Sequence, residues 1–157
     1  MNLTNYQMLE YNRNNHIEGV YEHKNNIIKT YGGSVGHIIN SRENDFHGFD
    51  ELYFTTIDHD IVRGWKKHNK MILNLIVLSG SVEITLLDKR EKSKTKNMFN
   101  KILLSEKENK RLTVANNIWF AFKGISKFTS KMINFSNIIY DDSEISRVNI
   151  NEFKIQL

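Results

Sequence analysis

Short runs of alternating polar and apolar residues, separated by turn residues, constrain the fold of this chain more than any other feature. Residues 81–86 alternate strictly, which is the period-two pattern of a strand with one buried face. Residues 112–114 show the same alternation, and 119–122 and 132–135 indicate further strands. Many short strands at nearly regular spacing are typical of a sandwich or barrel rather than a parallel α/β sheet.

Turn residues lie between these runs, and helix signal is weak. Ser143 and Glu144, after Asp142, indicate at most a turn or two of helix near the C-terminus. We therefore expect one all-β domain over 1–157, with an N-terminal extension or dimer arm at 1–26 and a barrel at 27–157. The predicted turns are Gly32-Gly33, Asp58-His59-Asp60, Ser79-Gly80, Asn116-Asn117 and Lys123-Gly124.

Composition argues against nucleic acid and membrane as partners. The net charge of +4, from 22 Lys and Arg against 18 Asp and Glu, is small and scattered. The densest basic stretch, 89–96, has no interleaved aromatic residue, so we interpret it as a solvated hairpin loop. No apolar run approaches the roughly 20 residues of a membrane helix.

The cellular setting is predicted from what the sequence lacks. The N-terminal segment MNLTNYQMLEYNRNN has neither a basic start nor an apolar core, so no signal peptide is expected. The absence of cysteine excludes disulfides and thiolate metal sites and fits a reducing compartment. We expect a cytoplasmic protein.

Small double-sheet proteins often cover an edge strand by pairing with a second copy. The apolar and aromatic segments 27–31 and 153–157 are candidates for such pairing. A homodimer is therefore expected.

Several motifs lie in a fixed order along four-fifths of the chain. They are FDELYF (49–54), IVRG (61–64), LDKR (87–90), LLSE (103–106), RLTV (111–114), NIWFAF (117–122), the ungapped spacing from His68 to Gly80, and the tail YDDSEISR (140–147). In these motifs the chain resembles the small cupins related to dTDP-4-dehydrorhamnose 3,5-epimerase, and near its centre also the dTDP-sugar 3,4-ketoisomerases. The resemblance implies a double-stranded β-helix, or jelly-roll barrel, that is usually dimeric, with a sugar nucleotide across the barrel mouth.

The chain departs from this family at the residues expected to move protons. The epimerases carry a histidine base where this chain has Lys66, and their general-acid tyrosine aligns with Asn134. Of the two histidines in the ketoisomerase motif, only the second is kept, as His68.

We take His68 and Lys66 as the candidate catalytic residues. Histidine titrates near pH 7 and can act as a base unaided, whereas lysine needs desolvation or a cationic neighbour. On an extended strand, residues two apart face the same way, so the two side chains are expected to share a site. Lys66 could act as a base or simply bind a phosphate or ligand oxygen, and His68 could instead be a hydrogen-bonded structural histidine.

The resemblance also implies that the arginine before the turn glycine reaches the nucleotide diphosphate, as a guanidinium can. This arginine could instead be a surface or structural residue. Aromatic side chains on the strands could stack on a base or sugar, or form plain core. Asparagines in apolar strands need partners, from a polar pocket or from the backbone. The candidate substrate-binding residues are thus Arg63, Tyr53, Asn74, Trp119, Phe122 and Asn134.

No metal and no cofactor is predicted. Metal-dependent cupins use two closely spaced histidines, a downstream acid and a third histidine, and His68 has no such companions. The other histidines, which fall in loop-like sequence, are His16, His23, His37, His47 and His59.

Three functions stay open at this point. The leading hypothesis is an epimerase or isomerase that acts on a nucleotide-linked 4-keto-(deoxy)sugar in surface-polysaccharide biosynthesis, by proton abstraction next to the ketone. The alternative is a non-catalytic cupin that binds a sugar nucleotide or carbohydrate and has lost the epimerase dyad. A purely structural dimerisation module is the third.

Overall fold

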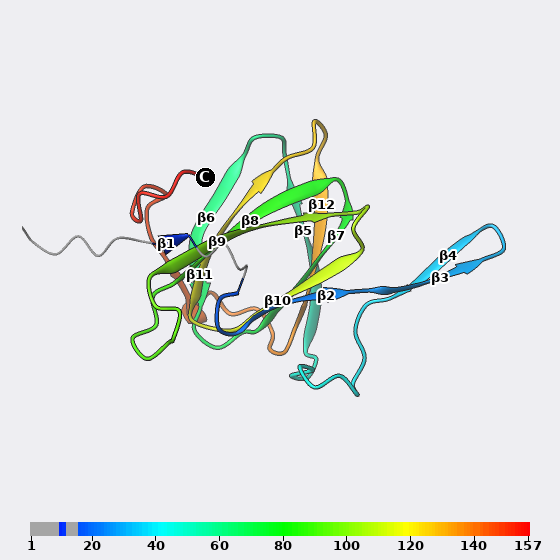
Figure 1. Ribbon diagram of the computed structural model, residues 1–157, viewed down its shortest axis with the longest axis horizontal. Helices are drawn as coiled ribbons and strands as arrows, with labels where there is room; N and C mark the ends of the chain where they lie inside the picture. Colours follow the sequence, from blue (N-terminus) through cyan, green and yellow to red (C-terminus); the bar gives the residue numbers. More distant parts are fainter. Residues whose placement is uncertain (1–9, 12–15) are drawn as a thin grey trace, which may run out of the picture.

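Nearly every described element is a strand (Figure 1). The computed structural model describes residues 10–11 and 16–157. The strands are β1 (Glu10–Tyr11), β2 (Val20–Lys24), β3 (Asn26–Thr30), β4 (Gly33–His37), β5 (Glu51–Ile57), β6 (Val62–His68), β7 (Leu73–Ser79), β8 (Ser81–Asp88), β9 (Met98–Ser105), β10 (Lys110–Val114), β11 (Ile118–Gly124), β12 (Ser130–Ser136) and β13 (Ile145–Arg147). One 3₁₀ turn, η1 (Asp142–Glu144), precedes β13, as the sequence predicts. The all-β prediction is confirmed.

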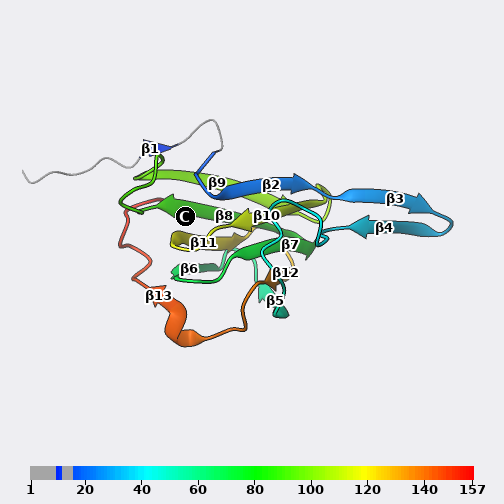
Figure 2. The same ribbon diagram turned by 90° about the horizontal axis from the view of Figure 1, so that it is seen from below.

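The strands form two main sheets, which lie against each other (Figure 2). The first sheet has the order β1-β9-β8-β11-β6-β13, and the second has the order β2-β10-β7-β12-β5. All pairings within them are antiparallel except that of β1 with β9. Among the described residues, no helix is long and apolar enough to cross a membrane.

The main core lies between the two sheets and follows the predicted alternation. Val82, Ile84 and Leu86 of β8 are fully buried, and they face Leu73 and Leu75 of β7 in the same apolar cluster. Burying an aliphatic side chain of this size contributes roughly 1.5–3 kcal/mol, so this inner layer is the main source of stability.

A second apolar cluster covers the outer face of the first sheet. Trp65 is fully buried there, and the C-terminal segment packs over it, with the Phe153 ring centroid 5.3 Å from that of Trp65. The Trp65 indole N–H donates to the carbonyl of Ile150 at 3.1 Å. The segment 153–157, a predicted candidate for pairing with a second copy, thus packs on its own chain.

The β3–β4 hairpin projects from one end of the molecule (Figure 1), and all ten of its strand residues are exposed. The domain boundaries differ from the predicted division at residue 27. Residues 20–24, assigned to the N-terminal extension, pair with β10 as part of the second sheet, whereas 26–37 stand outside the barrel. Residues 1–9 and 12–15 of that extension lie outside the described residues.

The predicted turn at Lys123-Gly124 is part of β11 instead. A Cβ on Gly124 would lie 2.2 Å from the carbonyl oxygen of Asp58, so this glycine allows two backbones to approach closely. The loop 89–97 does connect two antiparallel strands, as expected.

Candidate active site

A cavity of about 590 Å³ opens between β5 of one sheet and β6 of the other. Inward-facing residues of β5 form one wall, β6 and β11 form the opposite wall, and the segment around η1 and β13 closes the side. Its lining residues are Glu51, Tyr53, Thr55, Arg63, Gly64, Trp65, Lys66, Phe122, Tyr140, Arg147 and Val148.

Lys66 and His68 lie on the same face of β6, as their spacing predicts. The Lys66 Nζ atom lies 5.2 Å from the centroid of the Phe120 ring, and the His68 ring stacks on the same phenyl group with centroids 5.9 Å apart. The intervening residue Lys67 faces the other way, with its Nζ 5.4 Å from the Trp119 ring. Strand alternation therefore brings the two candidate catalytic side chains together.

His68 is held by a carboxylate that lies 76 residues further along the chain. Its Nδ1 atom is hydrogen-bonded to Oε1 of Glu144, and both side chains are almost fully buried. The second carboxylate oxygen of Glu144 accepts the amide N–H groups of Lys70 at 2.9 Å and Met71 at 3.3 Å. Because Nδ1–H donates to the carboxylate, the lone pair of the neutral imidazole is placed on Nε2.

The surroundings keep this imidazole neutral at pH 7. Burial lowers the pKa of His68, the hydrogen bond and charge of Glu144 oppose that shift, and the nearby Lys66 charge adds to it. For Glu144, burial acts to raise the pKa, but the hydrogen bonds from His68 and the Lys70 amide outweigh it and lower the pKa. Among the described residues, Nε2 of His68 has no hydrogen-bond partner. The result is a neutral imidazole with a free lone pair, as a general base requires.

Lys66 is the other unusual group. Burial, together with the charges of Arg63 and Arg147, lowers its pKa to about 8. Its Nζ lies over both Phe120 and Phe122, and among the described residues no carboxylate lies within ion-pair distance of it. At pH 7 the side chain is still mainly an ammonium ion, and its charge is available to an anionic ligand or a developing oxyanion.

Tyr53 projects into the cavity from β5. Its phenolic oxygen accepts a hydrogen bond from Nδ2 of Asn134 at 2.9 Å. Burial raises the pKa of Tyr53, while the Asn134 hydrogen bond acts to lower it. The phenol is therefore protonated at pH 7, and its own proton can be donated to a group in the cavity.

Two arginines stand at the rim. Arg63 is exposed, with its guanidinium carbon 5.6 Å from the centroid of Phe122, and Nη1 donates to the carbonyl of Thr56 at 3.4 Å. Arg147 is held by the carboxylate of Asp142 at 2.7 Å. Both planar cations are accessible, and this is the arrangement that phosphate oxygens favour.

The sequence profile described as "WxcM-like, C-terminal" (FdtA) matches residues 19–156, which is most of the chain. The chain belongs to this family. Among individual proteins, it is 23% identical over 111 residues to "Probable low-salt glycan biosynthesis epimerase Agl13" of Haloferax volcanii, covering 68% of this chain and 71% of that protein.

Solved structures share the fold of this FdtA-family chain. The dTDP sugar isomerase of Desulfovibrio desulfuricans G20 is 25% identical with a TM-score of 0.81, over 87% of each chain. The dTDP-6-deoxy-D-glucose-3,5-epimerase of Legionella pneumophila, in complex with dTDP-4-keto-L-rhamnose, is 13% identical with a TM-score of 0.78, over 91% of this chain and 78% of the other. The predicted cupin-type double-stranded β-helix is confirmed. Each of these relatives is named as an epimerase or isomerase, the predicted enzyme class.

The FdtA-family cavity brings together most of the predicted site residues but not all of them. Lys66, Arg63, Tyr53 and Phe122 line it; His68 adjoins Lys66, and Asn134 holds the Tyr53 hydroxyl. Trp119 lies on the outer face of the first sheet against Phe153, 5.4 Å between ring centroids. The side chain of Asn74 lies on the outer face of the second sheet, where it binds Arg111 and Thr113.

Glu144 is the partner of His68 that the sequence analysis did not single out. It belongs to the tail motif 140–147, which the resemblance to the ketoisomerases had singled out without assigning a role to any residue. The pairing of Ile145 with His68 in the β13–β6 ladder brings this motif next to His68. Among the described residues, no three His, Cys, Asp or Glu side chains gather as metal ligands would.

Proposed function

We propose that this protein is a cofactor-independent isomerase or epimerase of a nucleotide-linked 4-keto sugar. The observation that carries the proposal is a neutral His68, held by Glu144 and next to Lys66, whose ammonium group lines a cavity with two rim arginines. Proton abstraction next to a ketone requires a base and a group that stabilises the oxyanion, and the two arginines suit a substrate that carries a diphosphate.

In the proposed reaction, Nε2 of His68 removes the proton from the carbon next to the ketone. The C–H bonding electrons form the enolate double bond, and the ketone oxygen gains the negative charge, which Lys66 stabilises. Tyr53 then gives its proton to carbon. Return to the same carbon from the opposite face is epimerisation. For ketone transfer, the proton goes to the former ketone carbon while the hydroxyl proton of the neighbouring carbon passes to the enolate oxygen, so that the neighbouring carbon becomes the new ketone. In both cases the proton held by His68 returns to the Tyr53 phenolate through solvent.

The substrate class follows from the charges and from the relatives. Arg63 and Arg147 would grip the diphosphate, and Phe122 would pack against the sugar or base. The Desulfovibrio relative is a dTDP sugar isomerase, the Legionella structure holds a dTDP-4-keto sugar, and the Haloferax relative is named for glycan biosynthesis. These names support our proposal that the reaction belongs to the synthesis of surface polysaccharides.

The His68–Glu144 pair weakens the case for a non-catalytic binder. That alternative was motivated by Lys66 and Asn134, which stand where the epimerases have their base and their acid. In this chain a different histidine has a carboxylate partner, and Tyr53 places a phenol next to Asn134. The base and the acid are thus supplied from neighbouring positions.

Proton NMR in D₂O with dTDP-, UDP- and GDP-linked 4-keto-6-deoxy sugars tests the proposal. We expect loss of the C3 or C5 proton signal of one substrate, and the ¹³C position of the ketone then separates epimerisation from ketone transfer. Ligand line broadening without exchange would overturn catalysis and favour the binding protein. No exchange and no binding with any of the three nucleotides would overturn the proposed substrate class.

We also propose that the protein is a homodimer. The projecting β3–β4 hairpin exposes Ile27, Ile28, Tyr31 and Val35, and an isolated two-stranded hairpin is marginally stable in water. Packing against a second copy would bury these side chains. Sedimentation equilibrium measures the mass directly, and a monomer at micromolar concentration would contradict the proposal. The cytoplasmic location stays a prediction.

A further inference from the structure

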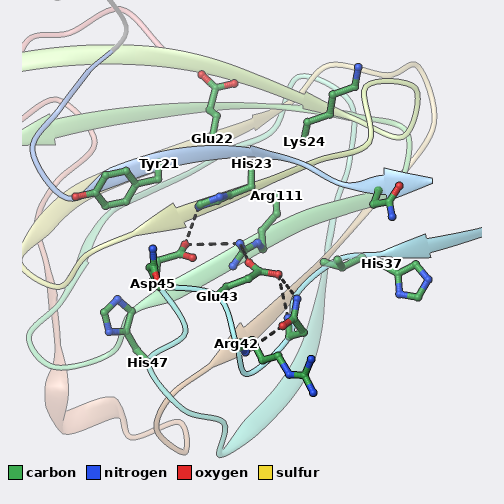
Figure 3. Close-up of a pocket in the computed structure, with 14 residues that line it drawn as sticks. Tyr21, Glu22, His23, Lys24, His37, Arg42, Glu43, Asp45, His47 and Arg111 are labelled. Atoms are coloured by element: carbon green, nitrogen blue, oxygen red, sulfur yellow. Dashed lines mark hydrogen bonds and ion pairs between the residues drawn. The ribbon is translucent and has the colours of Figure 1, made fainter. Parts of the chain in front are cut away.

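An ion cluster centred on a buried arginine lies on the outer face of the second sheet, on the side away from the active-site cavity. Arg111 of β10 is fully buried there, with Nη2 2.5 Å from a carboxylate oxygen of Glu43 and 3.6 Å from one of Asp45. Figure 3 shows the guanidinium facing both carboxylates, with His23 on the other side of Asp45, 2.7 Å away. The cluster lines a cavity of about 1160 Å³ near the base of the projecting hairpin.

Arg111 also reaches inward, to Asn74 of β7. Its Nη1 atom donates to Oδ1 of Asn74 at 3.0 Å, and the hydroxyl of Thr113 donates to the same oxygen at 2.8 Å. The Nδ2 group of Asn74 donates to the carbonyl of Phe135 at 3.1 Å. Three hydrogen bonds therefore fix the Asn74 side chain, and with it the local backbone of β7.

That backbone is the link to the active site. The amide N–H of Asn74 donates to Oδ1 of Asn134 at 2.9 Å, and Nδ2 of Asn134 donates to the phenolic oxygen of Tyr53 at 2.9 Å. A continuous series of hydrogen bonds thus crosses the sheet, from the outer ion cluster to the cavity wall.

We propose that Arg111 and Asn74 are positioning residues for Tyr53, the proton donor of the proposed function on which this inference rests. An asparagine amide has one accepting and one donating end. The Asn74 N–H occupies the accepting end of Asn134, which leaves the donating end for the phenol. A flipped Asn134 amide would present its oxygen to the Tyr53 hydroxyl instead, would capture the proton that the reaction needs, and would stop stabilising the phenolate.

Other groups also act on the Tyr53 phenol, and they stay constant in the test. Glu51 on the same strand, with Tyr140 and Glu144 from the tail, act to raise its pKa. The cations that line the same cavity are Arg63, Lys66 and Arg147. None of these belongs to the outer cluster, so a change at Arg111 reaches Tyr53 through Asn74 and Asn134.

The test combines kinetics with ¹⁹F NMR of protein labelled with 3-fluorotyrosine, whose phenol is more acidic than that of tyrosine. A Tyr53→Phe spectrum assigns the Tyr53 signal. In Arg111→Met we expect its titration to move upward by about half a pH unit, since losing part of one hydrogen bond changes the ionisation free energy by under 1.36 kcal/mol. We expect kcat to fall by about tenfold, which is part of the rate enhancement that a well-positioned general acid provides, and KM to stay unchanged.

The matched control is Phe46→Ala, which loosens the same loop where Phe46 contacts Phe135 but leaves every hydrogen bond of the series in place. An unmoved Tyr53 titration in Arg111→Met, or an equal shift in Phe46→Ala, overturns the inference. If Arg111→Met fails to fold, Arg111→Lys keeps the charge opposite Glu43 and should show a smaller shift in the same direction. The titration needs no turnover, so it tests the series even if no sugar in the panel reacts.

Discussion

The two faces of β6 have opposite roles although their residues alternate along one strand. The inner face carries Lys66 and His68, which are polar groups placed against the phenyl ring of Phe120. The outer face carries Trp65 and Lys67, of which the first is sealed under the C-terminal segment. The inner face lowers the stability of the fold, because it removes ionisable groups from water. The outer face raises the stability, because it buries apolar surface.

The difference shows why neighbouring residues of one motif need separate interpretations. Two of the four side chains in 65–68 face the site, and two secure the strand that carries them. Substitutions should therefore separate into those that change turnover and those that change the free energy of unfolding.

The largest effect is expected for His68→Ala. Removing the base should lower turnover by about 10²–10⁴-fold, the usual contribution of a placed general base. The rate of solvent deuterium incorporation measures this directly. Lys67→Ala, one residue away on the outer face, is the control and should keep wild-type turnover. Equal losses of turnover in both variants would show that the two faces do not have separate roles.

Glu144→Gln should lower turnover by up to about 100-fold, as loss of a partner that orients a histidine typically does. Glu144 acts to raise the pKa of His68, against burial, so its neutralisation lets that pKa fall further. Because the neutral imidazole is the active form, the acid limb of the pH–rate profile should move to lower pH. An unchanged limb with unchanged turnover would show that Glu144 does not hold the base.

Phe153→Ala tests whether the outer face of β6 stabilises the fold without affecting turnover. The half-buried phenyl ring packs against Trp65 and Trp119, so its removal should lower the free energy of unfolding by about 2 kcal/mol. Urea unfolding gives this value. Turnover at 25 °C should stay at the wild-type level, and a proportionate loss of turnover would mean that the tail also controls the site.

The smallest effect, and the one that separates two roles of Lys66, is expected for Lys66→Arg. If the ammonium ion stabilises the enolate, wild-type turnover should fall as pH rises through about 8, where Lys66 loses its proton. An arginine stays charged, so the variant should lose this alkaline limb while its optimum drops by about tenfold. Wild-type turnover that instead rises through pH 8 would identify Lys66 as a base.

The sequence predicts the all-β class, several of the strands and the shared face of Lys66 and His68, because strand periodicity is a local property of the chain. It does not predict that the side chains of Trp119 and Asn74 lie on outer faces of the sheets. Both faces of their strands are covered by other parts of the chain. Alternation alone therefore cannot show which face points into the barrel. Gly124 is predicted to lie in a turn but belongs to a strand, for a similar reason. Its close contact with the backbone of Asp58 cannot be read from the local sequence.

By itself, then, the sequence determined the all-β class and the shared strand face of Lys66 and His68. Only the tertiary structure decided that Glu144 would hold His68 and that Asn134 would support Tyr53, two pairs separated by 76 and 81 residues. The physical reason is that a side chain's pKa and orientation depend on partners and burial. Both are set by which strands become neighbours after folding, not by the residues beside them in the chain.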